Sequence, residues 1–141
     1  MAKSKTKKYT LEYIIRSSPI ILYDFLTTAT GLQQWFADEV DNEGKVFLFT
    51  WQGETETAEM ISNEDDDYIR YRWDWQEKDE FFEFRIDKTE ITNDTILYVS
   101  DFAEERDIEN SKRLWDAQIQ NLMKRIGASW LISNYLFENI D

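Results

Sequence analysis

The apolar residues in the last third of the chain follow a single helical stripe. They recur in steps of three, four and seven residues at Trp115, Ile119, Leu122, Ile126, Trp130 and Phe137. This spacing predicts an amphipathic helix from about Asn110 to about Phe137. At 1.5 Å per residue the helix is roughly 42 Å long, so it can lie across an entire sheet. Gly127 inside it costs about 1 kcal/mol relative to Ala, which indicates a close backbone, a kink or open space.

Before this helix, apolar residues alternate with polar ones in short runs, which is typical of strands with one buried face. The alternation is cleanest at Phe82, Phe84 and Ile86. The predicted strands cover residues 9–15, 45–51, 54–61, 68–75, 81–91 and 95–102, with a short additional strand near 39–41. Turn-forming clusters separate the runs from residue 39 onward. The pattern therefore predicts an antiparallel meander within a sheet of about six to seven strands.

Two short helices are predicted between the first strand and the meander. Ser18 and Pro19 supply an N-cap followed by proline at the first helical position, and this helix ends near Thr27. After a short break, Thr30 and Gln33 have the spacing of a capping box. They predict a second helix that leads into Leu32, Trp35 and Phe36.

The amino-acid composition limits the kinds of catalytic and metal-binding site that the chain can form. It contains no His and no Cys, which excludes disulfides, Cys nucleophiles, His bases and zinc sites built on nitrogen or sulfur. Sixteen Lys and Arg against 29 Asp and Glu give a formal net charge of −13, and such a surface repels nucleic acids and anionic membranes. No apolar stretch is long enough to span a bilayer. We expect a cytoplasmic protein without a cofactor or a metal.

The length of 141 residues fits one domain with one core, and no linker rich in Pro, Gly or Ser interrupts it. We expect this domain to cover residues 9–138. A basic, flexible segment over residues 1–8 precedes it, and residues 139–141 form the C-terminal end.

Several short motifs occur in a characteristic order along the chain. They are Ile15-Arg16-Ser17-Ser18-Pro19, Tyr23-Asp24-Phe25-Leu26, Leu32-Gln33-Gln34-Trp35-Phe36-Ala37-Asp38, Phe49-Thr50-Trp51-Gln52-Gly53, Tyr71-Arg72-Trp73, Leu114-Trp115-Asp116 and Leu122-Met123-Lys124. In this order, over roughly residues 9–130, they resemble the START-like (SRPBCC) superfamily. The branch that they resemble most is related to the activator of the heat-shock protein 90 ATPase (AHSA-like).

The resemblance implies an α+β helix-grip fold, in which a curved antiparallel sheet wraps around the C-terminal helix and leaves a cavity between them. Members bind lipids, sterols, polyketides or other apolar molecules in that cavity, and some assist chaperones. We expect the protein to differ from the chaperone activator, because these 141 residues contain no counterpart of that protein's separate N-terminal domain. It also lacks the His residues on which some catalytic relatives depend.

Aromatic residues dominate the predicted space between sheet and helix, and six of them are Trp. A cavity lined by such rings accepts a flat apolar ligand. The predicted ligand-binding residues are Trp35, Phe36, Trp51, Tyr71, Trp73, Phe84, Trp115, Ile119, Leu122, Met123 and Ile126. The alternative is that the rings fill the space and leave no cavity.

Acidic side chains are abundant, but catalysis by a carboxylate requires burial and a raised pKa. Asp74 and Asp101 each stand beside aromatic residues. Alternation turns both to the opposite face of their strands, so we expect both to be solvated. The acidic run at residues 64–67 lacks the spacing of a calcium loop and predicts a solvated turn. No catalytic residue is therefore assigned.

Three functions remain in order of preference. The first is non-enzymatic binding of a small hydrophobic or lipid-like ligand in the cavity. The second is a protein-interaction domain, similar to a co-chaperone, with a filled core and a chaperone-like partner. The third is a small cyclase- or hydrolase-like enzyme. We expect a monomer or a weak dimer.

Overall fold

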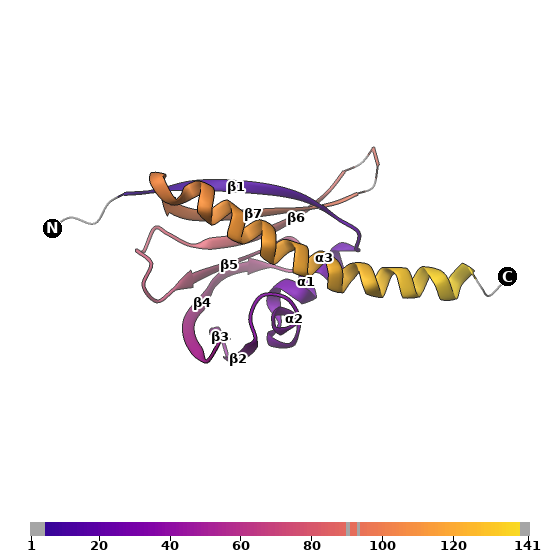
Figure 1. The fold of residues 1–141 in the computed structure, drawn as a ribbon, viewed down its shortest axis with the longest axis horizontal. Helices are drawn as coiled ribbons and strands as arrows, with labels where there is room; N and C mark the ends of the chain where they lie inside the picture. The colour runs from indigo at the N-terminus through magenta and orange to yellow at the C-terminus, as the bar shows by residue number, and fades with distance from the viewer. Residues whose placement is uncertain (1–4, 90, 93, 139–141) are drawn as a thin grey trace.

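One sheet of seven antiparallel strands forms the body of the protein, and a long helix lies across one of its faces (Figure 1). The computed structural model describes residues 5–89, 91–92 and 94–138, and the side chains of those up to residue 127. The strands are β1 (Thr6–Ile15), β2 (Glu39–Glu43), β3 (Val46–Trp51), β4 (Glu54–Glu64), β5 (Tyr68–Trp73), β6 (Phe82–Lys88) and β7 (Thr95–Glu104). Their spatial order is β1-β7-β6-β5-β4-β3-β2, so β1 and β2 form the two edges.

Strands β2 to β7 form a meander in which each strand pairs with the next, as the alternating runs predict. Strand β1 pairs with β7 over all 10 of its residues, so the first and the last strand are neighbours. The tight turns at Gly44 and Gly53 have φ angles of 60° and 83°, which glycine adopts without a steric penalty. A register shift between Met60 and Ser62 marks a bulge in β4, and such a bulge bends the strand.

Strand β1 begins at Thr6, earlier than predicted, and includes the two lysines that follow it. The Thr6 hydroxyl donates to the Glu80 carboxylate, and Lys7 Nζ lies 3.2 Å from Glu105 Oε1. These contacts fix part of residues 1–8, the segment that we expected to precede the domain and to be flexible. Residues 1–4 and 139–141 of the predicted terminal segments lie outside the described residues.

Two strands end earlier than the alternation predicts. Strand β6 ends at Lys88, because the chain then turns and Thr89 N–H donates to Asp94 O at 3.0 Å. Strand β5 ends at Trp73, because Gln76 N–H donates to Trp73 O at 3.1 Å and closes the next turn.

Helix α1 (Pro19–Thr27) begins where the sequence predicts. Ser18 Oγ accepts a hydrogen bond from Ile21 N–H at 3.3 Å, and proline occupies the first turn, where its missing N–H costs no helical hydrogen bond. The helix contacts β5 and β6 with its buried side chains, which include Leu22 and Leu26. It therefore closes one end of the space under the long helix.

Helix α2 (Ala29–Gln33) begins earlier than predicted. Thr28 Oγ1 accepts a hydrogen bond from Gly31 N–H at 2.9 Å, so Thr28 is the N-cap and the prediction of Thr30 is wrong. The same residue ends α1, since Thr28 N–H donates to Asp24 O at 3.2 Å. One residue therefore separates the two helices, and their backbones lie close together.

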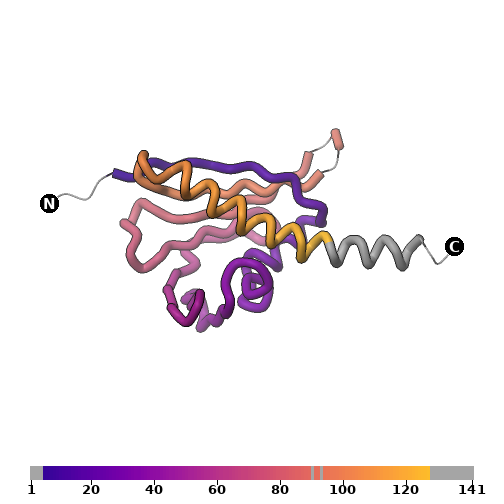
Figure 2. The backbone as a smooth tube through the Cα atoms, viewed as in Figure 1, coloured from indigo at the N-terminus to yellow at the C-terminus, as the bar shows by residue number. Residues whose placement is uncertain are grey.

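The long helix α3 (Ile108–Glu138) follows a short 3-10 turn, η1 (Glu105–Asp107), and runs diagonally across the sheet (Figure 2). Its predicted stripe faces the sheet at the four positions that can be checked, and all four are buried: Trp115, Ile119, Leu122 and Ile126. The side chains of Trp130 and Phe137 lie outside the described part. No helix in the described part of the chain is both long enough and apolar enough to cross a membrane.

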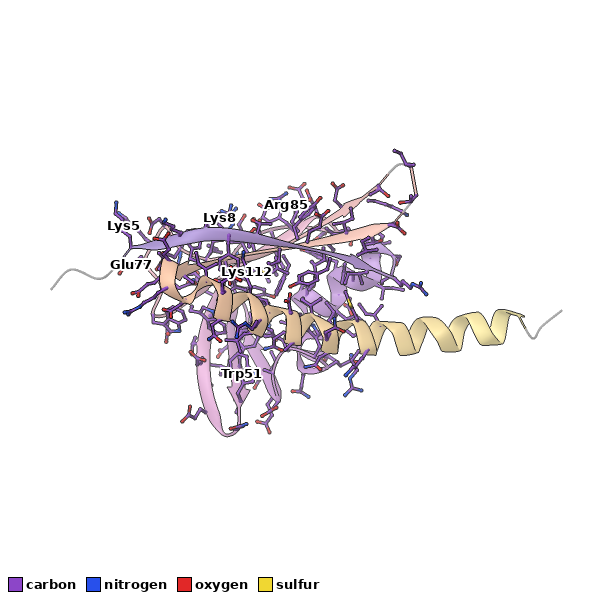
Figure 3. All side chains as sticks on the ribbon, turned by 45° about the horizontal axis from the view of Figure 1, so that its top comes forward. Lys5, Lys8, Trp51, Glu77, Arg85 and Lys112 are labelled. Carbon is purple, nitrogen blue, oxygen red and sulfur yellow. The ribbon has the colours of Figure 1, made fainter. Side chains whose placement is uncertain are left out.

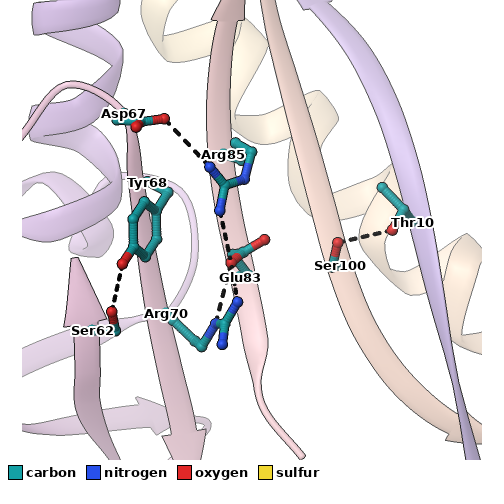
Figure 4. A network of polar contacts seen from close by, with 8 residues as sticks. All are labelled: Thr10, Ser62, Asp67, Tyr68, Arg70, Glu83, Arg85 and Ser100. Carbon is teal, nitrogen blue, oxygen red and sulfur yellow. Dashed lines mark hydrogen bonds and ion pairs between the residues drawn. The ribbon is translucent and has the colours of Figure 1, made fainter. Parts of the chain in front are cut away.

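The outer face of the sheet is lined by polar cross-strand contacts (Figure 4). Glu83 on β6 is 5% exposed and accepts from Arg70 Nη2 at 2.8 Å, while Arg85 Nη2 lies 3.5 Å from it. Thr10 and Ser100 share a hydrogen bond of 2.9 Å between β1 and β7. Buried Glu83 therefore has two cationic partners on this face, and the apolar core lies on the other face.

Two glycines provide a matched test of the packing. A Cβ at Gly31 would lie 2.4 Å from Asp24 O and 2.7 Å from Phe25 Cα, whereas a Cβ at Gly127 meets nothing within 4 Å. We expect Gly31→Ala to lower the free energy of unfolding by about 2 kcal/mol, because backbone atoms must move. Gly127→Ala should raise it by about 0.5–1 kcal/mol, since alanine favours the helix. Urea unfolding followed by Trp fluorescence measures both, and a loss in both variants would contradict this packing.

Candidate functional site

The side chains that the sequence predicts for a ligand site come together between the sheet and α3. Eight are buried, namely Trp35, Phe36, Tyr71, Phe84, Trp115, Ile119, Leu122 and Ile126. Three are partly buried and pack against them, namely Trp51, Trp73 and Met123. They come from β3, β5, β6, α3 and the segment that joins α2 to β2. The strand alternation and the helical stripe therefore predict correctly which side chains of the strands and of α3 face the space between the sheet and α3.

The ring of Phe36 lies at the centre of this group. Its centroid is between 5.1 and 6.5 Å from seven other aromatic rings. It stacks on Trp115 of α3 at 5.9 Å on one side, and contacts Phe49 of β3 edge-on at 5.1 Å. Phe36 is 4% exposed. Its ring thus occupies space between the sheet and the helix, where the sequence analysis expects a cavity.

Side-chain donors on both sides hold the backbone that carries this ring. Phe36 O accepts from Trp51 Nε1 at 2.8 Å and from Gln118 Nε2 of α3 at 3.1 Å. About two turns further along α3, Arg125 Nε donates to Gln34 O at 3.1 Å. Residues 34–38, which we call the α2–β2 connection, are therefore attached to both the sheet and α3.

A groove of about 640 Å³ lies outside this connection, between it and α3. We call it the α3 groove. Trp35, Phe36, Ala37 and Trp51 contribute its apolar lining, and Figure 3 shows Trp51 below α3, on the side of β3 and β4. Ligand sites typically measure about 300–1,000 Å³, so its volume suits a small molecule. Of the predicted site residues, only Trp35, Phe36 and Trp51 reach it.

The polar lining of the α3 groove was missed by the sequence analysis. Gln33, Gln34 and Asp38 line it on one side, and Gln118, Asn121, Lys124 and Arg125 line it on α3. One signal could have found the α3 side: residues 117–127 contain two cations, three amides and no acid, in a chain with a net charge of −13. The groove therefore offers hydrogen-bond donors above an aromatic floor.

The surroundings of Asp101 differ from the prediction that its carboxylate is solvated. Its Oδ2 accepts from Trp115 Nε1 at 2.9 Å, and its Oδ1 accepts from Phe102 N–H at 2.7 Å. Burial raises the pKa of Asp101 to about 6. The carboxylate is turned away from Phe102, as the alternation requires, but that side of β7 is the inner face. Asp74 is exposed, as predicted.

The arrangement is suited to holding a molecule by stacking and hydrogen bonding. In the described part of the chain, no three His, Cys, Asp or Glu side chains gather closely enough to hold a metal ion. The run at residues 64–67 is exposed, as expected of a solvated turn.

Comparison with known proteins finds a matching family and several similar structures. The chain matches the START-like superfamily domain over residues 2–128. A solution NMR structure of a protein from Bacteroides fragilis is 34% identical, with a TM-score of 0.63 over 86% of this chain and 91% of that one. The Aha1 dimer from Colwellia psychrerythraea is 14% identical, with a TM-score of 0.71 over 85% and 96% of the two chains.

A third similar structure is DynU16, a protein of the dynemicin biosynthetic locus. It is 14% identical, with a TM-score of 0.70 over 86% of this chain and 48% of that one. At this level of identity the two structures share the fold alone. No curated protein sequence matches the chain.

Asp101 makes stability depend on pH. Its pKa is 3.8 in the unfolded chain and about 6 in the folded protein, so folding favours the protonated form. Its contribution is present below about pH 4 and is lost as the pH rises through about 6. Between pH 4 and pH 7 we expect the free energy of unfolding to fall by about 2 kcal/mol more in the wild type than in Asp101→Asn. Urea unfolding from pH 4 to 7 measures this, and parallel profiles would contradict it.

Proposed function

We propose that this chain, which belongs to the START-like superfamily, binds a small amphipathic molecule in the α3 groove without transforming it. The observation that carries the proposal is the groove itself, because its 640 Å³ combine an aromatic floor with a polar rim. Stacking on Trp51 can hold an apolar part, while the side chains of α3 can hold a polar part. The proposed site is therefore the outer side of the predicted one.

The packed interior supports binding at the groove rather than deep under α3. Phe36 stacks on Trp115 at 5.9 Å and on Phe82 at 6.0 Å, and the rings of Phe82 and Phe84 are fully buried. A ligand larger than the groove must displace the Phe36 ring. Such displacement needs the α2–β2 connection to move, and the two bonds accepted by Phe36 O resist this movement.

A second candidate is a protein-interaction domain with a filled core. Ile20 and Ile21 of α1 are 68% and 53% exposed and lie beside a groove of about 570 Å³ that Asp65 and Asp66 also line. Exposed apolar side chains of this size favour contact with a protein. Since the Aha1 structure is a dimer, sedimentation of the wild type and of Ile20→Ser/Ile21→Ser tests self-association. A weak dimer lost in the variant supports this candidate, and a monomer in both counts against this form of it.

Filling the α3 groove should prevent binding. Asn121 lines the groove and is exposed, so Asn121→Trp can occupy the space without disturbing the core. With 1-decanol as the probe, we expect the indole N–H signal of Trp51 in a ¹H–¹⁵N correlation spectrum to shift in the wild type. The apparent affinity should fall at least about tenfold in Asn121→Trp.

Gln120→Trp is the matched control, because Gln120 is an exposed neighbour on α3 that does not line the groove. It should bind 1-decanol as the wild type does. Absence of a Trp51 shift in the wild type, or equal weakening in the two Trp variants, would overturn the proposed site.

A further inference from the structure

We infer that the α3 groove selects a single-chain amphiphile with an anionic carboxylate head, and that Lys124 and Arg125 bind this head. The inference rests on the proposed function, since it names the class of molecule that the same groove takes. The tail then lies along the apolar floor, against Trp51. The observations that carry it are the distribution of charge and the position of the donors on α3.

Charge is distributed unevenly over the two sides of the molecule. Residues 38–67 contain eleven acids and one base, and they form β2, β3 and β4. Residues 117–127 of α3 contain Lys124, Arg125 and no acid. An anionic head is therefore repelled by the strands at one edge of the sheet and attracted by this part of α3.

Both cations of this segment line the groove. Lys124 is exposed and makes no ion pair among the described residues. Arg125 is positioned by its Nε–H bond to Gln34 O at 3.1 Å, so the guanidinium is held at the rim of the groove. An ammonium and a guanidinium on one rim form charge-assisted hydrogen bonds with a carboxylate.

The donors that attach the α2–β2 connection to α3 are also the donors that a carboxylate would use. Gln118 Nε2 donates to Phe36 O at 3.1 Å, and Arg125 Nε donates to Gln34 O. A carboxylate is a stronger acceptor than a backbone carbonyl. Binding of the head therefore competes with the attachment of the connection to α3, while the tail lies on the floor of the groove.

Among the described residues that line the groove, Asp38 is the one carboxylate, and it sets the orientation of the ligand. Asp38 Oδ2 accepts from Gln52 N–H at 2.8 Å, so Asp38 is held beside the turn between β3 and β4. An anionic head avoids this rim and is directed to α3. A cationic amphiphile would have Asp38 as its one carboxylate partner among the described lining residues and would face the two cations.

The experiment compares amphiphiles that share a tail and differ in the head. Decanoate, 1-decanol and decylammonium are titrated into the full chain at pH 7.5 and 0.15 M salt, and Trp51 indole shifts give the affinities. We expect decanoate to bind about tenfold more tightly than 1-decanol, and decylammonium more weakly than either. Acetate, which has the head without the tail, should not displace decanoate.

Charge variants then locate the head. Lys124→Gln/Arg125→Gln should weaken decanoate about tenfold and 1-decanol less than about twofold. Lys112→Gln/Arg113→Gln removes the same charge from α3 away from the groove and should preserve the preference. Lys124→Gln alone leaves the Arg125–Gln34 bond intact and should weaken decanoate about threefold.

The outcomes separate this inference from the proposed function. If no decyl compound binds, both fail. If 1-decanol binds as tightly as decanoate, or if the groove variant and the control weaken decanoate equally, the inference fails and binding in the groove stands. A preference for decanoate that disappears only in the groove variants supports the inference.

Discussion

The insertion of Phe36 between the sheet and α3 is the contact on which the other features of the structure depend. Its ring contacts side chains of α3 and of strands β3, β5 and β6, so it joins α3 to the sheet, which the sheet hydrogen bonds do not do. The two donors to its carbonyl, Trp51 and Gln118, fix the backbone on both sides. Without this ring, α3 would cover a void, because the apolar rings of the strands are already in place. The α2–β2 connection thus determines how closely α3 packs.

The same insertion explains why a groove lies outside the core. The connection fills the interior with its ring, and side chains of α3 donate to its backbone. The residues that do so are polar because they flank the buried stripe, and they line the α3 groove as a consequence. Binding at the groove and release of the connection involve the same donors, Gln118 and Arg125. In this account the packing of the core and the recognition of a ligand are coupled.

The sequence predicts the framework because local patterns determine it. The stripe of α3, the cap at Ser18 and the alternating strands follow from periods and from residue preferences, and the START-like resemblance agrees with them. The groove could not be predicted in the same way, since Gln118 and Phe36 meet across 82 residues of sequence. Asp101 shows a second limit. Alternation places it correctly opposite Phe102, but the pattern of a single strand does not reveal which of its two faces carries the core. The position of Thr28 as the cap depends on the close approach of α1 and α2.

The most direct test of this account is the free energy of unfolding of Phe36→Ala. We predict a loss of about 3–5 kcal/mol, because a buried ring is removed and the rigid cluster around it cannot collapse. Phe81→Ala is the matched control, since that ring lies on the outer face, half-buried under Arg70, and should cost about 1 kcal/mol. A loss for Phe36→Ala no larger than that for Phe81→Ala would contradict the central position of Phe36.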